Sequence, residues 1–153
     1  MADTCVNGCE LCESEGGATI FRAGKWRAVR VTGIEGEAYR GFCRVIWNAH
    51  VKELTDLDPA DRRQFMDAVF QLEAALRASL APDKMNIASL GNLTPHLHWH
   101  VIPRFADDPA YPRPIWAVDL AQAASLDTLT VKHRRGSENG NWEQAVRRAL
   151  ESV

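Results

Sequence analysis

The sequence lacks long apolar runs and any strong excess of one charge. Its 153 residues include 18 basic and 20 acidic side chains, which give a formal net charge of −2 at pH 7. No stretch approaches the roughly 20 apolar residues of a membrane-spanning helix, and the N-terminus has neither the basic start nor the apolar core of a signal peptide. The broad basic surface of a duplex nucleic-acid binder is also missing. We therefore expect a cytoplasmic protein without a membrane or duplex nucleic-acid partner.

Cysteine is scarce, with four in the chain. In a reducing compartment this number argues against a disulfide framework. Cys5, Cys9 and Cys12 lie close together near the N-terminus, which favours a metal site over a bridge, whereas Cys43 stands alone in an apolar stretch and fits a small core residue. Cys9 and Cys12 form a C-x-x-C pair. Two thiolates supply only half of a tetrahedral site, so the pair alone fits an ordinary turn as well as a metal site.

Apolar periodicity predicts an α+β fold with an antiparallel sheet of about five strands. The expected strands lie on either side of a turn at 23–25, at 39–50, at 84–92 and at 96–105. The length fits one domain over residues 1–153, with a cysteine loop at 1–17.

One long helix and a C-terminal helix are expected beside the sheet. The long helix should begin after Asp58, a capping residue followed by Pro59, and end near Pro82. Residues 138–153 predict the C-terminal helix, and the Pro-rich stretch that follows residue 105 begins as loop.

Histidine is also rare, yet three of the five in the chain lie within five residues. His96, His98 and His100 alternate with apolar residues, so a strand would place the three imidazoles on one side and the apolar side chains toward the core. At about 3.3 Å of rise per residue the row is about 13 Å long. That length prevents one metal ion from binding all three histidines of a regular strand.

Three interpretations of the row compete. It is a polar sheet face without a task, a metal centre that uses two of the histidines, or a site of nucleophilic catalysis in which one imidazole attacks. The surrounding residues favour chemistry on a phosphate. Asn86, Asn92 and Arg104 supply hydrogen-bond donors, and the stretch contains no acid to complete a hard metal site or act as a general base.

The segment His96–Ile102, His-Leu-His-Trp-His-Val-Ile, resembles the signature of the histidine triad (HIT) family, His-φ-His-φ-His-φ-φ, where φ is apolar. Asn86, Asn92, Pro103-Arg104 and a strand that ends in His50 extend the resemblance over most of the chain. Residues 106–153 form the part without a clear match, and we regard them as variable in the family. The resemblance implies a nucleotidyl hydrolase or transferase that needs no catalytic cofactor and forms a homodimer.

The resemblance also implies roles for individual residues. His98 would attack the α-phosphorus of a nucleoside phosphoramidate or dinucleoside polyphosphate and form a nucleotidyl-histidine that water opens. His96 would orient His98, and His100 would hydrogen-bond the phosphate or the leaving group. Asn86, Asn92 and Arg104 would bind the substrate. Neutral imidazole, with an ordinary pKa near 6.5, is available as a nucleophile at cellular pH.

Two other functions stay open at this point. One is a nucleotide-binding or regulatory protein with little turnover, and the other is a metalloenzyme centred on His96 and His98. The acid that usually grips the ribose hydroxyls in the family is missing from residues 31–33.

A structural zinc ion is implied by the same resemblance. Some family members carry an N-terminal C-x-x-C, a histidine before the long helix and the first triad histidine as ligands. The matching residues here are Cys9, Cys12, His50 and His96, and Cys5 is an alternative to Cys9. Zinc in this position would orient the histidine strand and would not be the catalytic metal.

Overall fold

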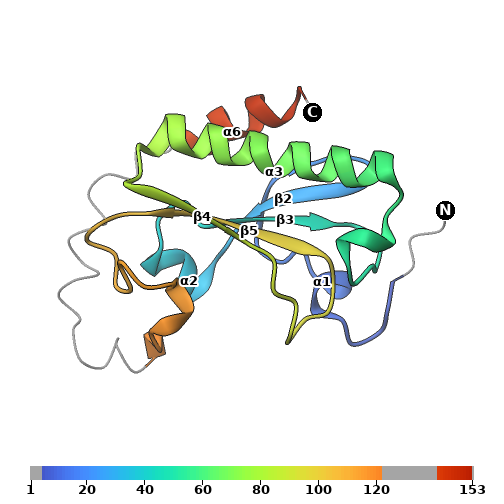
Figure 1. Cartoon of the computed structure of the whole chain (residues 1–153), viewed down its shortest axis with the longest axis horizontal. Helices are drawn as coiled ribbons and strands as arrows, with labels where there is room; N and C mark the ends of the chain where they lie inside the picture. The colour runs from blue at the N-terminus through green and yellow to red at the C-terminus, as the bar shows by residue number, and fades with distance from the viewer. Residues whose placement is uncertain (1–4, 122–140, 153) are drawn as a thin grey trace.

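The computed structural model describes residues 5–121 and 141–152. Its centre is a five-stranded sheet in the order β1-β2-β3-β5-β4, in which every neighbouring pair is antiparallel (Figure 1). The strands are β1 (Ala18–Arg22), β2 (Trp26–Arg30), β3 (Cys43–Trp47), β4 (Lys84–Ala88) and β5 (His98–Arg104). The predicted α+β fold with about five antiparallel strands is confirmed.

Two helices, α3 (Pro59–Leu80) and α6 (Trp142–Leu150), cover one face of the sheet (Figure 1). The carboxylate of Asp58 accepts hydrogen bonds from the first free N–H groups of α3, and Pro59 occupies the first turn, as predicted. The helix ends at Leu80, where Ala81 adopts a left-handed conformation with φ 46°. α6 lies within the predicted range 138–153, of which residues 138–140 fall outside the described part.

The core lies between α3, α6 and this face of the sheet. Leu97 and Val101 point into it, as the alternation with the histidines predicts, and Trp99 packs against it. The buried side chains of α3 that meet them recur on one side of the helix: Phe65, Val69, Leu72, Leu76 and Leu80. This packing leaves the histidine side of β5 on the opposite face of the sheet.

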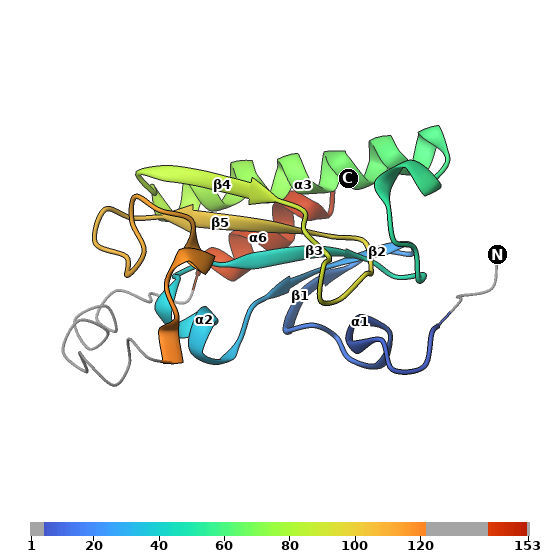
Figure 2. The same cartoon turned by 60° about the horizontal axis from the view of Figure 1, so that its bottom comes forward.

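Short elements cover that opposite face. α1 (Glu10–Glu13) and α2 (Gly33–Ala38) lie there together with the segment that follows β5, which includes the 3-10 turn η2 (Ile115–Ala117) (Figure 2). A further 3-10 turn, η1 (Leu54–Asp56), precedes α3. Sequence periodicity did not predict α1 and α2 because helices of four and six residues are too short to repeat an apolar position.

Strand ends differ from the predicted ones by a few residues. The strand predicted at 39–50 is β3 at 43–47, and the strand predicted to begin at 96 begins at His98. Leu97 still pairs by its backbone, donating to the carbonyl of Val51 and accepting from the N–H of Trp47. Among the described helices, none combines the length and apolar character needed to cross a bilayer. A single domain over residues 1–153 stays a prediction, because residues 122–140 fall outside the described part.

Candidate functional site

His98 and His100 lie side by side on β5, with ring centroids 4.8 Å apart, and His96 lies immediately before the strand. The exposed fractions of the three residues are 1% for His96, 7% for His98 and 6% for His100. Histidines that only formed the polar outer face of a sheet would be exposed to solvent. The burial of three imidazoles therefore argues against the first of the three interpretations.

Two backbone carbonyls determine the tautomers of the first two histidines. Nε2 of His96 lies 2.6 Å from the carbonyl oxygen of Trp47, and Nδ1 of His98 lies 2.6 Å from the carbonyl oxygen of His96. A carbonyl only accepts, so these two ring nitrogens carry the protons and donate. Each neutral ring then keeps a free lone pair on its other nitrogen: Nδ1 of His96 and Nε2 of His98.

His100 completes the row. Its Nε2 lies 3.2 Å from Nε2 of His98. Because the His98 nitrogen is unprotonated, the proton in this contact belongs to His100, whose Nε2–H donates to His98. Within the described residues, Nδ1 of His100 has no hydrogen-bond partner. A ligand oxygen that displaced this contact would meet an N–H from His100 and a lone pair from His98.

Burial keeps all three rings neutral. Desolvation lowers the pKa values of His96 and His98, and the hydrogen bonds to the carbonyls of Trp47 and His96 offset this only in part. Desolvation lowers the pKa of His100 to about 3, together with repulsion from His98 when that ring is protonated and from the positive charge of Arg44. His98 therefore has an unprotonated Nε2 at neutral pH, which is the state required of a nucleophile.

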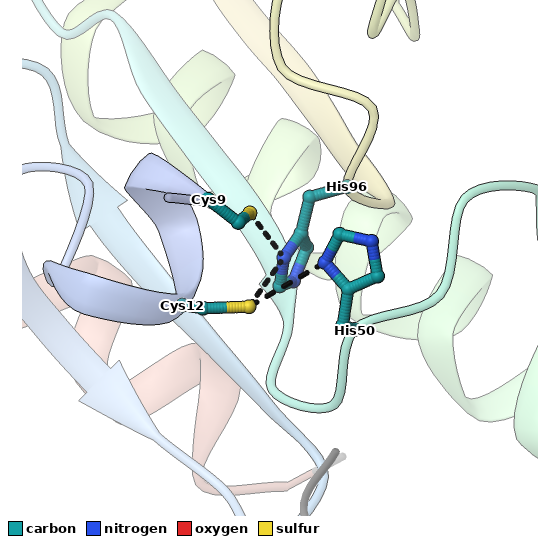
Figure 3. Close-up of side chains that lie close together, drawn as sticks. All are labelled: Cys9, Cys12, His50 and His96. Carbon is teal, nitrogen blue, oxygen red and sulfur yellow. Dashed lines mark hydrogen bonds between the residues drawn. The ribbon is translucent and has the colours of Figure 1, made fainter. Parts of the chain in front are cut away.

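Four residues from three segments form a cluster with metal-ligand chemistry. Cys9 and Cys12 at α1, His50 after β3, and His96 before β5 point toward one another (Figure 3), and their ligand atoms lie within 4.8 Å of one another. Cys9 Sγ and Cys12 Sγ lie 3.4 and 3.6 Å from His96 Nδ1, and Cys12 Sγ lies 3.4 Å from His50 Nδ1. The four predicted ligands are thus brought together, whereas Cys5 is exposed and outside the cluster.

The donor set fits a four-coordinate ion. A tetrahedral zinc with Zn–S near 2.3 Å and Zn–N near 2.0–2.1 Å separates sulfur from nitrogen by about 3.5 Å, close to the distances found here. Nδ1 of His96 carries the lone pair that a metal needs, because Nε2 donates to Trp47. An N–H donor to a ligand sulfur is also present, from Val6 to Cys12 at 3.4 Å. The cluster can therefore hold a metal ion, and it includes His96 but not His98.

Arg27 on β2 fastens the cysteine loop to the sheet. Its buried guanidinium donates to the carbonyls of Leu11, Ser14 and Glu15 and to Oδ1 of Asn48. Sequence patterns did not identify Arg27 as a site residue. The available signal was a charged side chain between the apolar residues Trp26 and Ala28 of β2.

A hollow of about 570 Å³ has Arg44 of β3 among its lining residues. Arg44 pairs in register with His100 across β3 and β5, so the two side chains lie on the same face of the sheet. Its guanidinium forms an ion pair with Glu35 at 3.7 Å and donates to the carbonyl of Gly16 at 3.4 Å. The other lining residues come from α1, the segment after it, the first residue of β1 and the two residues before α2: Glu10, Ser14, Glu15, Gly17, Ala18, Val31 and Thr32. Sequence patterns identified none of the polar ones as site residues.

The residues predicted to bind substrate lie in different surroundings. Asn92 is exposed in the connection between β4 and the histidines. Asn86 on β4 accepts a hydrogen bond from Arg104, which is 1% exposed and also forms a two-pronged ion pair with Asp108. The structure gives Arg104 and Asn86 structural partners, and their contact with substrate stays a prediction.

Comparisons with known proteins agree with this geometry. Residues 37–107 match the family model of the HIT domain. A histidine triad protein from Bradyrhizobium japonicum is 25% identical, with a TM-score of 0.63 over 89% of this chain and 92% of that one. A histidine triad protein from Marinobacter aquaeolei VT8 is 19% identical, with a TM-score of 0.66 over 91% and 92%.

A structure from Sulfolobus tokodaii strain 7, described as a hypothetical histidine triad nucleotide-binding protein, is 15% identical, with a TM-score of 0.54 over 89% and 85% of the two chains. No match was found among curated proteins. The matched domain contains the three histidines, and the solved structures share the arrangement of sheet and helices around them. Residues 37–107 of the chain therefore match a HIT domain, and the fold is similar to that of the solved histidine triad proteins.

Proposed function

We propose that this protein is a nucleotidyl hydrolase or transferase that cleaves at the α-phosphate of a nucleoside phosphoramidate or dinucleoside polyphosphate, with His98 as the nucleophile. The observation that carries the proposal is the hydrogen bond from Nδ1 of His98 to the carbonyl of His96 at 2.6 Å. It directs the lone pair of a neutral imidazole, on Nε2, toward the position where His100 offers an N–H. A nucleophile beside a donor for a phosphate oxygen is the minimum that such a reaction needs.

The proposed reaction has two steps, transfer of the nucleotidyl group to His98 and hydrolysis of the nucleotidyl-histidine. Nε2 of His98 attacks the α-phosphorus, a P–N bond to the histidine forms, and the bond to the leaving group breaks. With a phosphoramidate the leaving nitrogen takes up one proton from solvent and departs as an amine. Water then attacks the phosphorus, the P–N bond breaks, and one proton returns to solvent. His100 donates a hydrogen bond to a phosphate oxygen in both steps.

The hollow beside Arg44 is the proposed position of the nucleoside. Arg44, which lines the hollow, pairs in register with His100, and the carboxylate residues Glu10 and Glu35 also line it. A carboxylate accepts hydrogen bonds from both hydroxyls of a ribose. Glu35, at the start of α2, would take the place of the acid that is missing from residues 31–33.

We infer that Cys9, Cys12, His50 and His96 hold a structural zinc ion. The ion would tie the cysteine loop to the residue whose carbonyl orients His98, and the reaction would need no catalytic metal or other cofactor. The homodimer and the cytoplasmic location stay predictions.

Intact-mass analysis after a brief acid quench tests the function. Wild-type protein is mixed with an adenosine phosphoramidate and compared with His98→Gln, which keeps a side chain of similar size. We expect a transient adenylyl adduct and released nucleotide with wild type, and neither with His98→Gln, which should still bind AMP. AMP binding by the wild type without an adduct or turnover would instead indicate a nucleotide-binding protein.

A further inference from the structure

Trp116 lies against the third histidine of the row. Its ring contacts His100 edge-on, with centroids 5.0 Å apart and an interplanar angle of 70°. Phe42 contacts the same ring, at 5.7 Å and 44°. His100 therefore contacts two aromatic side chains that come from distant parts of the chain.

Trp116 is not placed there to fill the core. It is 43% exposed, whereas its neighbour Ile115 is 2% exposed and packs in a cluster with Tyr39, Phe42 and Ile102. The hydroxyl of Tyr39 also donates to the carbonyl of Ile115 at 3.1 Å. The packing of Ile115 thus holds the turn η2 in place. The ring of Trp116 takes no part in that packing and contacts His100 instead.

A second anchor links this segment to the strand of the histidines. Arg104, at the end of β5, donates to both carboxylate oxygens of Asp108 at 2.8 and 2.9 Å and to the carbonyl of Arg113 at 2.8 Å. The Asp108 carboxylate in turn accepts from the backbone N–H groups of Ala110 and Tyr111. The chain after β5 is therefore folded back over the site by buried, charge-assisted hydrogen bonds.

His100 needs such support more than the other two histidines. The rings of His96 and His98 are each oriented by a backbone carbonyl at 2.6 Å. Nδ1 of His100 has no partner among the described residues, so only the Nε2 contact with His98 and the flanking rings orient it. Among the described residues, a ligand that displaced the Nε2 contact would leave the ring of His100 without a hydrogen bond from the protein, and the contacts with the flanking rings would then restrain it.

The geometry points to Trp116 as a positioning residue of this site: it helps to hold the ring of His100 in the free protein, and it keeps Nε2–H directed at the phosphate once a ligand has separated His100 from His98. The residue comes from the part of the chain beyond the matched domain. The catalytic consequence rests on the proposed function, whereas the orientation of the ring does not.

The test compares Trp116→Ala with Trp116→Phe. Phenylalanine keeps an aromatic edge for His100, and alanine does not. With an adenosine phosphoramidate, we expect Trp116→Ala to lower kcat by about tenfold to a hundredfold while KM changes by less than about threefold, and Trp116→Phe to restore most of kcat. Phe70→Ala, which removes an exposed aromatic ring from α3 on the other side of the sheet, is the matched control and should leave kcat unchanged.

A second readout does not depend on turnover. Nitrogen-15 spectra of histidine-labelled protein, with His100 assigned from His100→Gln, report the tautomer and titration of its ring. His98 and Arg44 are the charged or titratable groups that act on His100 from β5 and β3. We expect the Nε2–H tautomer and no titration above pH 5 in wild type and Trp116→Phe, and mixed tautomers with a higher pKa in Trp116→Ala.

The outcomes separate this inference from the proposed function. A wild type without turnover, but with the spectral change in Trp116→Ala, overturns the function and supports the positioning role. An unchanged His100 spectrum in folded Trp116→Ala overturns the inference. Equal loss of kcat in the Ala and Phe variants, together with a lower melting temperature in both, assigns Trp116 to structure alone and overturns it as well.

Discussion

The carbonyl oxygen of His96 accepts a hydrogen bond from Nδ1 of His98 at 2.6 Å. His96 uses both ring nitrogens and its backbone carbonyl. Its Nε2–H donates to the carbonyl of Trp47, and its Nδ1 faces the sulfur atoms of Cys9 and Cys12. Its carbonyl orients the ring of His98. One residue therefore belongs to both the metal-ligand cluster and the support of the proposed nucleophile. Whatever fixes His96 also fixes the direction of the lone pair on His98.

Loss of a metal ligand should therefore lower the thermal stability of the protein more than it lowers the rate of the reaction. We expect Cys12→Ser to lower the zinc content and to reduce the melting temperature by several degrees, because the cysteine loop loses its tie to His50 and His96. The value of kcat should fall by less than about tenfold, since Trp47 still holds His96. Metal analysis and thermal melts of the purified protein measure both.

Cys5→Ser is the control for that variant. Cys5 is exposed and lies outside the cluster, so its replacement should leave metal content and melting temperature as in the wild type. Wild-type protein that contains no zinc, or that melts at the same temperature with and without a chelator, would contradict the zinc proposal.

Glu35 should contribute to recognition of the ribose. If its carboxylate accepts from the hydroxyls of a nucleotide in the hollow, Glu35→Gln should weaken AMP binding by about tenfold, the usual effect of losing a hydrogen bond to a charged group. Binding of 2′,3′-dideoxy-AMP, which lacks both hydroxyls, should be the same in the two proteins. Isothermal titration with the two nucleotides gives this comparison, and an equal loss for both would place Glu35 elsewhere in the pocket.

Local signals explain which parts were predictable from the sequence. The cap at Asp58 and Pro59 predicted the start of α3, and the alternation around His98 predicted which face of β5 turns to the core. Such signals involve residues a few positions apart, whose relation is set by helix or strand geometry. The HIT signature is also local, because it lies within the seven consecutive residues His96–Ile102.

The surroundings of the histidines depend on contacts between distant residues. Arg27 binds carbonyls of the cysteine loop, and Arg44 meets Glu35 on a helix too short to show periodicity. Trp116 contacts His100 from a segment that the packing of Ile115 and the hydrogen bonds between Arg104 and Asp108 hold in place. No spacing rule relates these pairs, although an arginine flanked by apolar residues in a strand was an available signal for Arg27 and Arg44.

The buried ion pair between Arg104 and Asp108 should be important for stability. Their side chains are 2% and 1% exposed. Burial raises the pKa of Asp108, but hydrogen bonds from Arg104 and from backbone N–H groups outweigh it and keep the pKa below its usual value. Arg104→Met leaves a buried carboxylate without its partner and should cost about 3–5 kcal/mol of unfolding free energy.

Urea unfolding measures that loss. Glu143→Gln is the control, because it breaks an ion pair with Arg30 in which both side chains are well exposed, and should change the free energy by less than about 1 kcal/mol. Similar values for the two variants would show that the buried pair does not stabilise the fold more than a surface pair.

The neutral state of His100 predicts a loss of stability in mild acid. Its pKa is about 3 in the folded protein and near 6.5 when exposed, so below pH 6.5 the unfolded chain binds a proton that the folded chain does not. Stability therefore falls as pH drops, by about 1.4 kcal/mol from this residue between pH 7.5 and 5.5. The lowered pKa values of His96 and His98 act in the same direction, whereas Asp108 acts only below its ordinary value of 3.8. In urea unfolding at the two pH values, the difference for His100→Gln should be smaller by that amount. An identical difference in both proteins would mean that His100 is already charged in the folded state at pH 5.5.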